Sequence, residues 1–119
     1  MNIEDQLSLI EDFKVLLRRA MIYAKHSHDF IFDDSVDNST ALFYLNVAAS
    51  KFAAAESLYY SRINELESIE AKEIFQLFEV YMKEALTNYR TNHSHQWSDI
   101  EFNRLKEAFA YSPFAFENK

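Results

Sequence analysis

The complete absence of glycine restricts the fold of this chain more than any other feature, and Pro113 is the only proline among its 119 residues. Glycine supplies the positive φ angle and the bare backbone that phosphate-binding loops, dinucleotide-binding turns and type I′ hairpins require. The sequence therefore excludes these three elements. Its helices are expected to end at Asn, Ser or His, because no glycine is available for the position after the last turn. Cysteine is also absent, which excludes disulfides, thiol nucleophiles and cysteine-based zinc sites.

The segment Ala41–Leu66 carries apolar residues on most of its circumference when it is placed on a helix with 3.6 residues per turn. A helix that is apolar on most sides is normally buried on most sides. The sequence therefore predicts that this segment is the central helix of a compact helical domain. Its middle contains alanines of little bulk that allow neighbouring helices to approach closely: Ala48, Ala49, Ala53, Ala54 and Ala55.

The N-terminal segment is predicted to form a first helix over residues 3–25, because its apolar residues recur at three- and four-residue spacing. Arg18 and Arg19 are assigned to its solvated face. Residues 26–40 are rich in Asp, Ser and Asn and are predicted to form a loop. The expected core-facing stripe of this helix consists of Ile3, Leu7, Ile10, Leu17, Ala20, Met21 and Ala24.

Two further helices are predicted in the C-terminal half. One runs over residues 70–90, with Ser68 as its cap. The other runs over residues 98–111, where Ser98–Glu101 matches a capping box and Pro113 ends the helix. Both segments show the apolar spacing of a helix with one buried face.

Helices joined by short connections tend to run antiparallel. We therefore expect a single all-α domain over residues 1–119, an antiparallel bundle of about four main helices with no sheet. The chain is long enough to bury a core. Its 49% hydrophobic and 16% aromatic content is too high for a disordered chain.

The net charge of −7 is spread over the whole chain. Residues 1–60 carry 5 basic and 9 acidic groups, and residues 61–119 carry 7 and 10. Because there is no basic segment, nonspecific binding to DNA is not expected. No apolar run reaches the roughly 20 residues of a membrane-spanning helix, and the acidic N-terminus is unlike a secretory signal. The sequence therefore predicts a cytoplasmic protein that does not enter a membrane.

All four histidines lie in two His-Ser-His sequences, at residues 26–28 and 93–95. In an up-down-up bundle both sequences should collect at one pole, together with the aspartates of residues 33–37. Imidazole and carboxylate groups are good zinc ligands. On a helix, however, two histidines separated by one residue point about 200° apart and cannot chelate one ion. Neither a metal site nor another cofactor is predicted, and the histidines are interpreted as exposed residues at helix ends.

A short motif, YRTNHSHQW at residues 89–97, precedes the last predicted helix. It resembles the R-x(4–6)-H signature of the HEPN superfamily. Members of this superfamily are small all-α domains, and many are metal-independent ribonucleases of toxin–antitoxin, phage-defence and CRISPR systems. The resemblance implies that Arg90 and His95 are catalytic, with Asn92 and His93 as further candidates. It also implies an RNA partner and a homodimer.

The motif departs from the family pattern at one position: Thr91 follows the arginine, where the family usually has Asn, Asp or His. If the resemblance holds, Arg90 would contact phosphate through two parallel hydrogen bonds. His95 would act as general acid or base on a ribose 2′-hydroxyl or on the leaving oxygen. On one continuous helix the two side chains would point about 140° apart. The helix must therefore break at Thr91–Asn92, or a second subunit must complete the site.

The alternative is a non-catalytic, acidic helical module that binds a protein partner or a second copy of itself. The sequence leaves open which of the two functions applies, and so whether the protein is an enzyme. They differ in whether Arg90 and His95 meet in a cleft. The anchors of such a module would be those aromatic residues that are exposed among Tyr44, Tyr59, Tyr60, Trp97, Phe114 and Phe116.

Overall fold

The computed structural model describes residues 3–31, 38–91 and 96–115. In these ranges the chain forms four long helices and one single-turn helix, and no strand. The expected all-α fold with about four main helices is therefore confirmed. The helices are α1 (Ile3–Ile31), α2 (Asn38–Ser61), α3 (Ile63–Leu66), α4 (Ile69–Thr91) and α5 (Gln96–Ala110).

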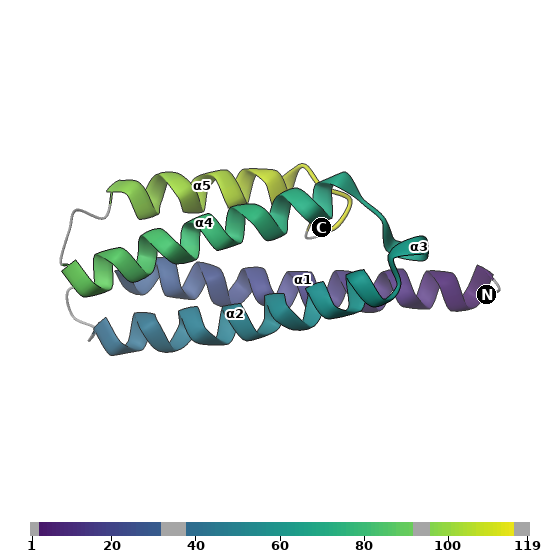
Figure 1. Cartoon of the computed structure of the whole chain (residues 1–119), viewed down its shortest axis with the longest axis horizontal. Coiled ribbons are helices and arrows are strands. Elements are labelled where there is room, and N and C mark those ends of the chain that lie inside the picture. The colour runs from purple at the N-terminus through teal and green to yellow at the C-terminus, as the bar shows by residue number, and fades with distance from the viewer. Residues whose placement is uncertain (1–2, 32–37, 92–95, 116–119) are drawn as a thin grey trace, which may run out of the picture.

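The long helices form two antiparallel hairpins that pack on each other (Figure 1). α1 lies along α2, and α4 lies along α5; contacts of α2 with α4 and of α1 with α5 join the hairpins. The 24 residues of α2 span about 36 Å, so the helices run along the longest dimension of a molecule that measures 51 × 31 × 21 Å. None of the described helices is both long and apolar enough to cross a membrane.

The core between the hairpins is built largely from aromatic rings. Phe52 of α2 stacks on Phe78 of α4 with ring centroids 4.0 Å apart. Phe13 of α1 contacts Tyr59 and Phe75, at 5.8 and 6.3 Å between centroids. Burying one such ring contributes about 1.5–3 kcal/mol. Small buried residues let the helix axes approach between the rings, namely Ala20, Ala24, Ala48, Ala55 and Ala71.

The prediction that Ala41–Leu66 is one central helix is wrong in two respects. α2 ends at Ser61, and Arg62 leaves the helical conformation at φ −126° and ψ 40° before the single turn of α3. In addition, α2 packs mainly against α1, and one of its sides faces solvent, where Ala53 and Ala54 are exposed. The prediction counted these alanines as apolar, but an alanine side chain is small enough to remain exposed. The apolar circumference therefore overestimated how much of α2 is buried.

α1 continues to Ile31, beyond the predicted end near residue 25. Local composition indicates a loop here, but tertiary packing keeps the chain helical. Ser27 is fully buried, and Lys25 and Asp29 form an ion pair of 2.7 Å across one helical turn. Packing of this kind commonly overrides weak intrinsic helix propensity.

The first turns of α1 are more exposed than predicted. They extend past the ends of the other helices (Figure 1), and Ile3 and Leu7 are 75% and 58% exposed. The predicted core stripe is therefore wrong at its N-terminal end. The buried residues of α1 are Leu9, Phe13, Leu17, Ala20, Met21, Ala24 and Ser27.

One of the two predicted helix caps is confirmed. The backbone N–H of Ala71 donates to Ser68 Oγ at 3.2 Å, so Ser68 caps α4 as expected. The capping box at Ser98 is wrong, because α5 begins earlier, at Gln96. Ser98 lies inside the first turn and is fully buried.

The segment after α5 folds back onto α1. Phe114 is buried against Phe13 in an edge-to-face contact with centroids 5.4 Å apart. The prediction that Arg18 lies on the solvated face is wrong, because its Nε and Nη2 donate to the carbonyl oxygens of Phe114 and Ala115 at 3.1 and 2.9 Å. Phe116 lies outside the described residues.

Candidate functional site

The helix ends that flank both His-Ser-His sequences meet at one pole of the bundle. α1 and α4 end there, and α2 and α5 begin there (Figure 1). This arrangement agrees with the predicted topology. Asn92, His93 and His95 lie outside the described residues, as do the aspartates of residues 33–37.

Arg90 lies near the end of one helix, and the next described helix begins after His95. Arg90 is the last but one residue of α4, which ends at Thr91, and α5 begins at Gln96, directly after His95. Because α4 and α5 are antiparallel, the described chain reverses its direction between Thr91 and Gln96 (Figure 1). The side chain of Arg90 is not among those that the structure describes, so the contact of Arg90 with His95 stays a prediction.

His26 and His28 both lie on α1 and project to different sides of it. His26 contacts α2, whereas His28 contacts α4 and α5. Because the two rings contact different helices, His26 and His28 cannot bind one metal ion together, as the helical geometry predicts. Within the described residues, no group of three or more His, Asp or Glu side chains could hold a metal ion.

His28 is enclosed where α1 meets α5. Its Nε2 lies 3.1 Å from Asp99 Oδ1, and its ring stacks on Phe102 with centroids 4.2 Å apart and planes inclined by 12°. Only 13% of its side chain is exposed. Burial lowers the pKa of His28 from its ordinary value, although the hydrogen bond and charge of Asp99 act in the opposite direction. The neutral ring is therefore favoured.

Ser27 and Tyr81 form a second buried contact beside His28. The hydroxyl of Ser27 donates to the carbonyl oxygen of Ala24 at 2.6 Å and lies 2.7 Å from the hydroxyl of Tyr81. Because the serine proton is directed at a carbonyl, Tyr81 is the donor in the second bond. Burial raises the pKa of Tyr81 well above its ordinary value. The pair therefore stays uncharged and holds α1 against α4, and its geometry does not produce a nucleophile.

Sequence reasoning missed this junction, although a signal was present. Ser27 follows Ala20 and Ala24 at the spacing of one helix face, which continues the buried stripe of α1 past the predicted helix end. Phe102 of α5 was likewise not assigned to the core, where it is buried.

On the other side of the same turns, His26 belongs to a surface cluster of five rings, which we term the aromatic platform: Tyr23, His26 and Phe30 of α1, and Phe43 and Tyr44 of α2. Tyr44 is its centre, with centroid distances of 6.3, 5.4 and 5.2 Å to the three rings of α1. His26 and Phe43 are exposed, and the other three rings are half-buried. The sequence signal is again helical spacing, because the α1 rings recur at three and four residues.

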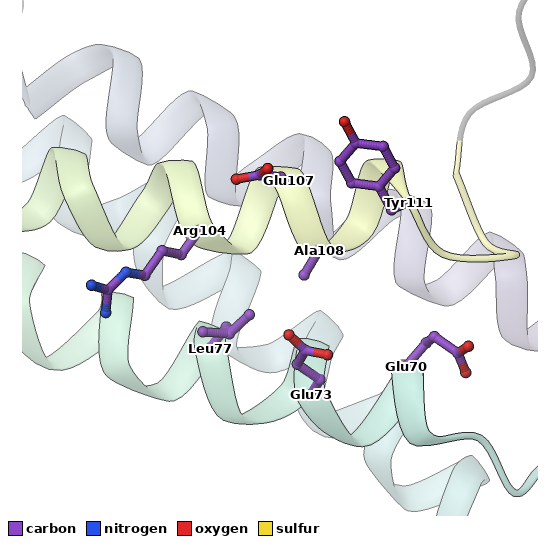
Figure 2. A pocket seen from close by; sticks show the side chains of 7 residues that line it. All are labelled: Glu70, Glu73, Leu77, Arg104, Glu107, Ala108 and Tyr111. Atoms are coloured by element: carbon purple, nitrogen blue, oxygen red, sulfur yellow. The ribbon is translucent and has the colours of Figure 1, made fainter.

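A groove of about 390 Å³ lies between the first half of α4 and the last half of α5, away from this pole (Figure 2). Leu77 and Ala108 supply apolar surface, and three carboxylates line it, from Glu70, Glu73 and Glu107. One arginine and one tyrosine complete the lining, which contains no histidine. The groove therefore offers no imidazole for acid–base chemistry.

The aromatic residues suggested as interaction anchors fall into two groups. Tyr59 and Phe114 are buried in the core and are unavailable to a partner. Tyr60 and Trp97 are largely exposed, and Tyr44 is half-buried in the aromatic platform.

The chain was compared with models of protein families, with curated proteins and with solved structures, and none of them matches it. The function therefore has to be argued from the residues and their arrangement.

Proposed function

We propose that this protein is a small helical RNA-binding protein that cleaves RNA without a metal ion, with Arg90 and His95 as its reacting pair. The observation that carries the proposal is the reversal of the chain between α4, which ends at Thr91, and the antiparallel α5, which begins at Gln96 (Figure 1). Such a reversal is what would allow two side chains that point about 140° apart on one continuous helix to converge. A four-residue connection, residues 92–95, then leads into α5.

The chemistry of the pair suits phosphodiester cleavage. Arg90 carries a permanent charge and two parallel donors for a phosphate. The ribose 2′-hydroxyl attacks the adjacent phosphorus, the bond to the 5′-oxygen breaks, and a 2′,3′-cyclic phosphate forms. His95 either accepts the proton of the 2′-hydroxyl or donates one to the 5′-oxygen. Asn92 and His93 are the further candidates in the same connection, and a second copy of the chain would complete the site.

The test is cleavage of a single-stranded RNA in the presence of EDTA. Wild-type protein should cleave and leave 2′,3′-cyclic phosphate ends, and Arg90→Ala and His95→Ala should each abolish cleavage while circular dichroism stays unchanged. Arg104→Ala is the matched control, because Arg104 is an exposed arginine of α5 that pairs only with the nearby Glu101 among described residues. An intact RNA after incubation with wild-type protein would refute the cleavage activity.

A second candidate, a non-catalytic module that binds a protein or a second copy of itself, is favoured by the outer side of α2. Phe43 and Tyr60 are 59% and 57% exposed there, and small residues such as Ala53 lie between them. Lys51 and Glu56 are the only charged residues of α2. A largely uncharged helix side in a chain of net charge −7 suits contact with another helix.

Light scattering after gel filtration tests this candidate. Ala53→Arg places a charge in the middle of the outer side of α2, and it should convert a dimer into a monomer if that side is the interface. Asn103→Arg, at an exposed position of α5, should leave the mass unchanged. A monomeric wild-type protein would exclude self-association through α2.

A further inference from the structure

The aromatic platform combines ring surface with solvent access. Tyr44 lies nearly parallel to Phe30 and to Tyr23, with planes inclined by 20° and 22°. His26 and Phe43 flank this stack and are exposed. Rings that served only the core would be enclosed, as Phe13 and Phe52 are. The platform instead leaves ring surface open to a ligand.

Two cations stand beside the platform. Arg19 precedes Tyr23 by one helical turn of α1, about 6 Å along the axis, and is exposed. Lys51 follows Tyr44 by two turns of α2, about 10 Å along the axis. Because α1 and α2 are antiparallel (Figure 1), both cations lie on the same side of the rings, toward the middle of the bundle.

The electrostatic surroundings leave these cations available. Neither Arg19 nor Lys51 forms an ion pair in the part of the chain that the structure describes. Asp29, near the rings, is neutralised by Lys25 at 2.7 Å. The next carboxylate on the same strip of α1 is Asp12, two turns before Arg19.

We propose that the aromatic platform binds single-stranded RNA, with bases stacked on its rings and phosphates held by Arg19 and Lys51. Stacking of a base on an aromatic ring is tolerant of sequence, and cations beside the rings attract the backbone. A duplex hides its base faces, and a chain of net charge −7 has no broad basic surface for it. These points favour a single strand over a duplex and over an uncharged protein helix.

The inference rests on the proposed function for the identity of the strand as RNA, and it extends that function. The platform and the end of α4 lie at the same pole of the bundle (Figure 1). A strand held on α1 and α2 would therefore be presented to the connection between α4 and α5. The platform would supply affinity, and Arg90 and His95 would supply the chemistry.

The test measures fluorescence anisotropy of a labelled ten-nucleotide RNA strand with 2′-O-methyl groups, which cannot be cleaved at its 2′-oxygens. Tyr44→Ala should weaken binding about tenfold or more. Because Tyr44 is half-buried, the exposed substitution Arg19→Glu provides a second variant that preserves the fold and should also reduce the salt dependence of binding. Tyr111→Ala, at an exposed tyrosine away from the platform, should bind like wild type.

Further measurements distinguish binding at the platform from cleavage by Arg90 and His95. Arg90→Ala should still bind the methylated strand, and a double strand of the same sequence should bind at least tenfold more weakly than the single strand. If wild-type protein cleaves RNA but Tyr44→Ala and Arg19→Glu bind the methylated strand normally, RNA binding by the platform is refuted while the proposed cleavage stands. RNA binding by the platform is also refuted if the wild-type protein does not bind the single strand, or if it binds the duplex equally well.

Discussion

The two histidines at the end of α1 are two residues apart and lie in opposite environments. His28 is enclosed by α4 and α5, with its ring against Phe102 and its Nε2 at Asp99. His26 lies at the surface among the rings of the platform. The same three-residue sequence therefore supplies an inner contact that closes the bundle and an outer group that a ligand can reach.

The difference follows from the helical state of residues 26–28. In an extended loop the two side chains could have turned to a common ligand, whereas on α1 they are about 200° apart. We infer that the inner side of this turn serves stability and the outer side serves binding. Substitutions can test the two sides separately.

The largest effect is expected on the inner side at Tyr81. Tyr81→Ala should lower the free energy of unfolding by about 3–5 kcal/mol, because it leaves a cavity between α1 and α4 and removes the partner of Ser27. Tyr81→Phe, which keeps the ring, should cost only about 1–2 kcal/mol. Urea denaturation measures both values. Similar, small losses for the two variants would show that the inner junction is not a packed contact.

The next largest effect on stability is expected from enlarging a buried alanine of α2, compared with enlarging an exposed one. Ala55 is fully buried, so Ala55→Leu should overpack the core and destabilise the protein by about 1–3 kcal/mol. Ala53 is exposed, so Ala53→Leu should change stability by no more than about 0.5 kcal/mol. Equal losses in urea melts would mean that both sides of α2 are covered, as the central-helix prediction required.

Substitutions of the two histidines should differ less in their effect on the free energy of unfolding. At neutral pH, His28→Gln should cost about 1–2 kcal/mol, because it removes the stacked ring and disturbs the bond to Asp99. His26→Gln should stay within about 0.5 kcal/mol, as is usual for an exposed position. Thermal or urea unfolding distinguishes them, and a reversed order would contradict the assignment of inner and outer sides.

The smallest expected effect is the pH dependence of stability that His28 causes. Because burial lowers the pKa of His28 in the folded state, the unfolded chain binds the proton more readily. The contribution of neutral His28 is fully present above the unfolded pKa of about 6.5 and is lost as the pH falls below it. His28→Gln should therefore lose less stability than wild type between pH 7 and 5.5. A steeper decline for His28→Gln would show that Asp99 outweighs burial.

Spacing and caps made much of the fold predictable from the sequence. α4 was placed to within one residue at each end, because Ser68 is a true cap and the apolar stripe is regular. The antiparallel order followed from short connections. The end of α1 was missed because the local composition of residues 26–31 favours a loop, whereas the stabilising contacts come from α4 and α5.

The sites were less predictable, for physical reasons that differ between them. The motif at residues 90–95 could be identified from the sequence, but His95 lies outside the described residues, so its contact with Arg90 stays a prediction. The aromatic platform could not be found from one segment, because it depends on the register in which α1 lies along α2. Tyr44 is far from Tyr23 in sequence, and only the tertiary fold brings their rings to 6.3 Å.

The most direct test of the division between inner and outer sides is an amide NMR titration of the wild-type protein with the 2′-O-methylated RNA strand. The account predicts chemical-shift changes around Arg19, Tyr44 and Lys51 and in the connection after Arg90, with little change at Tyr81. Changes confined to the groove lined by Glu70, Glu73 and Glu107, to the middle of the outer side of α2, or to the inner junction would contradict it. An unchanged spectrum at saturating RNA would contradict it as well.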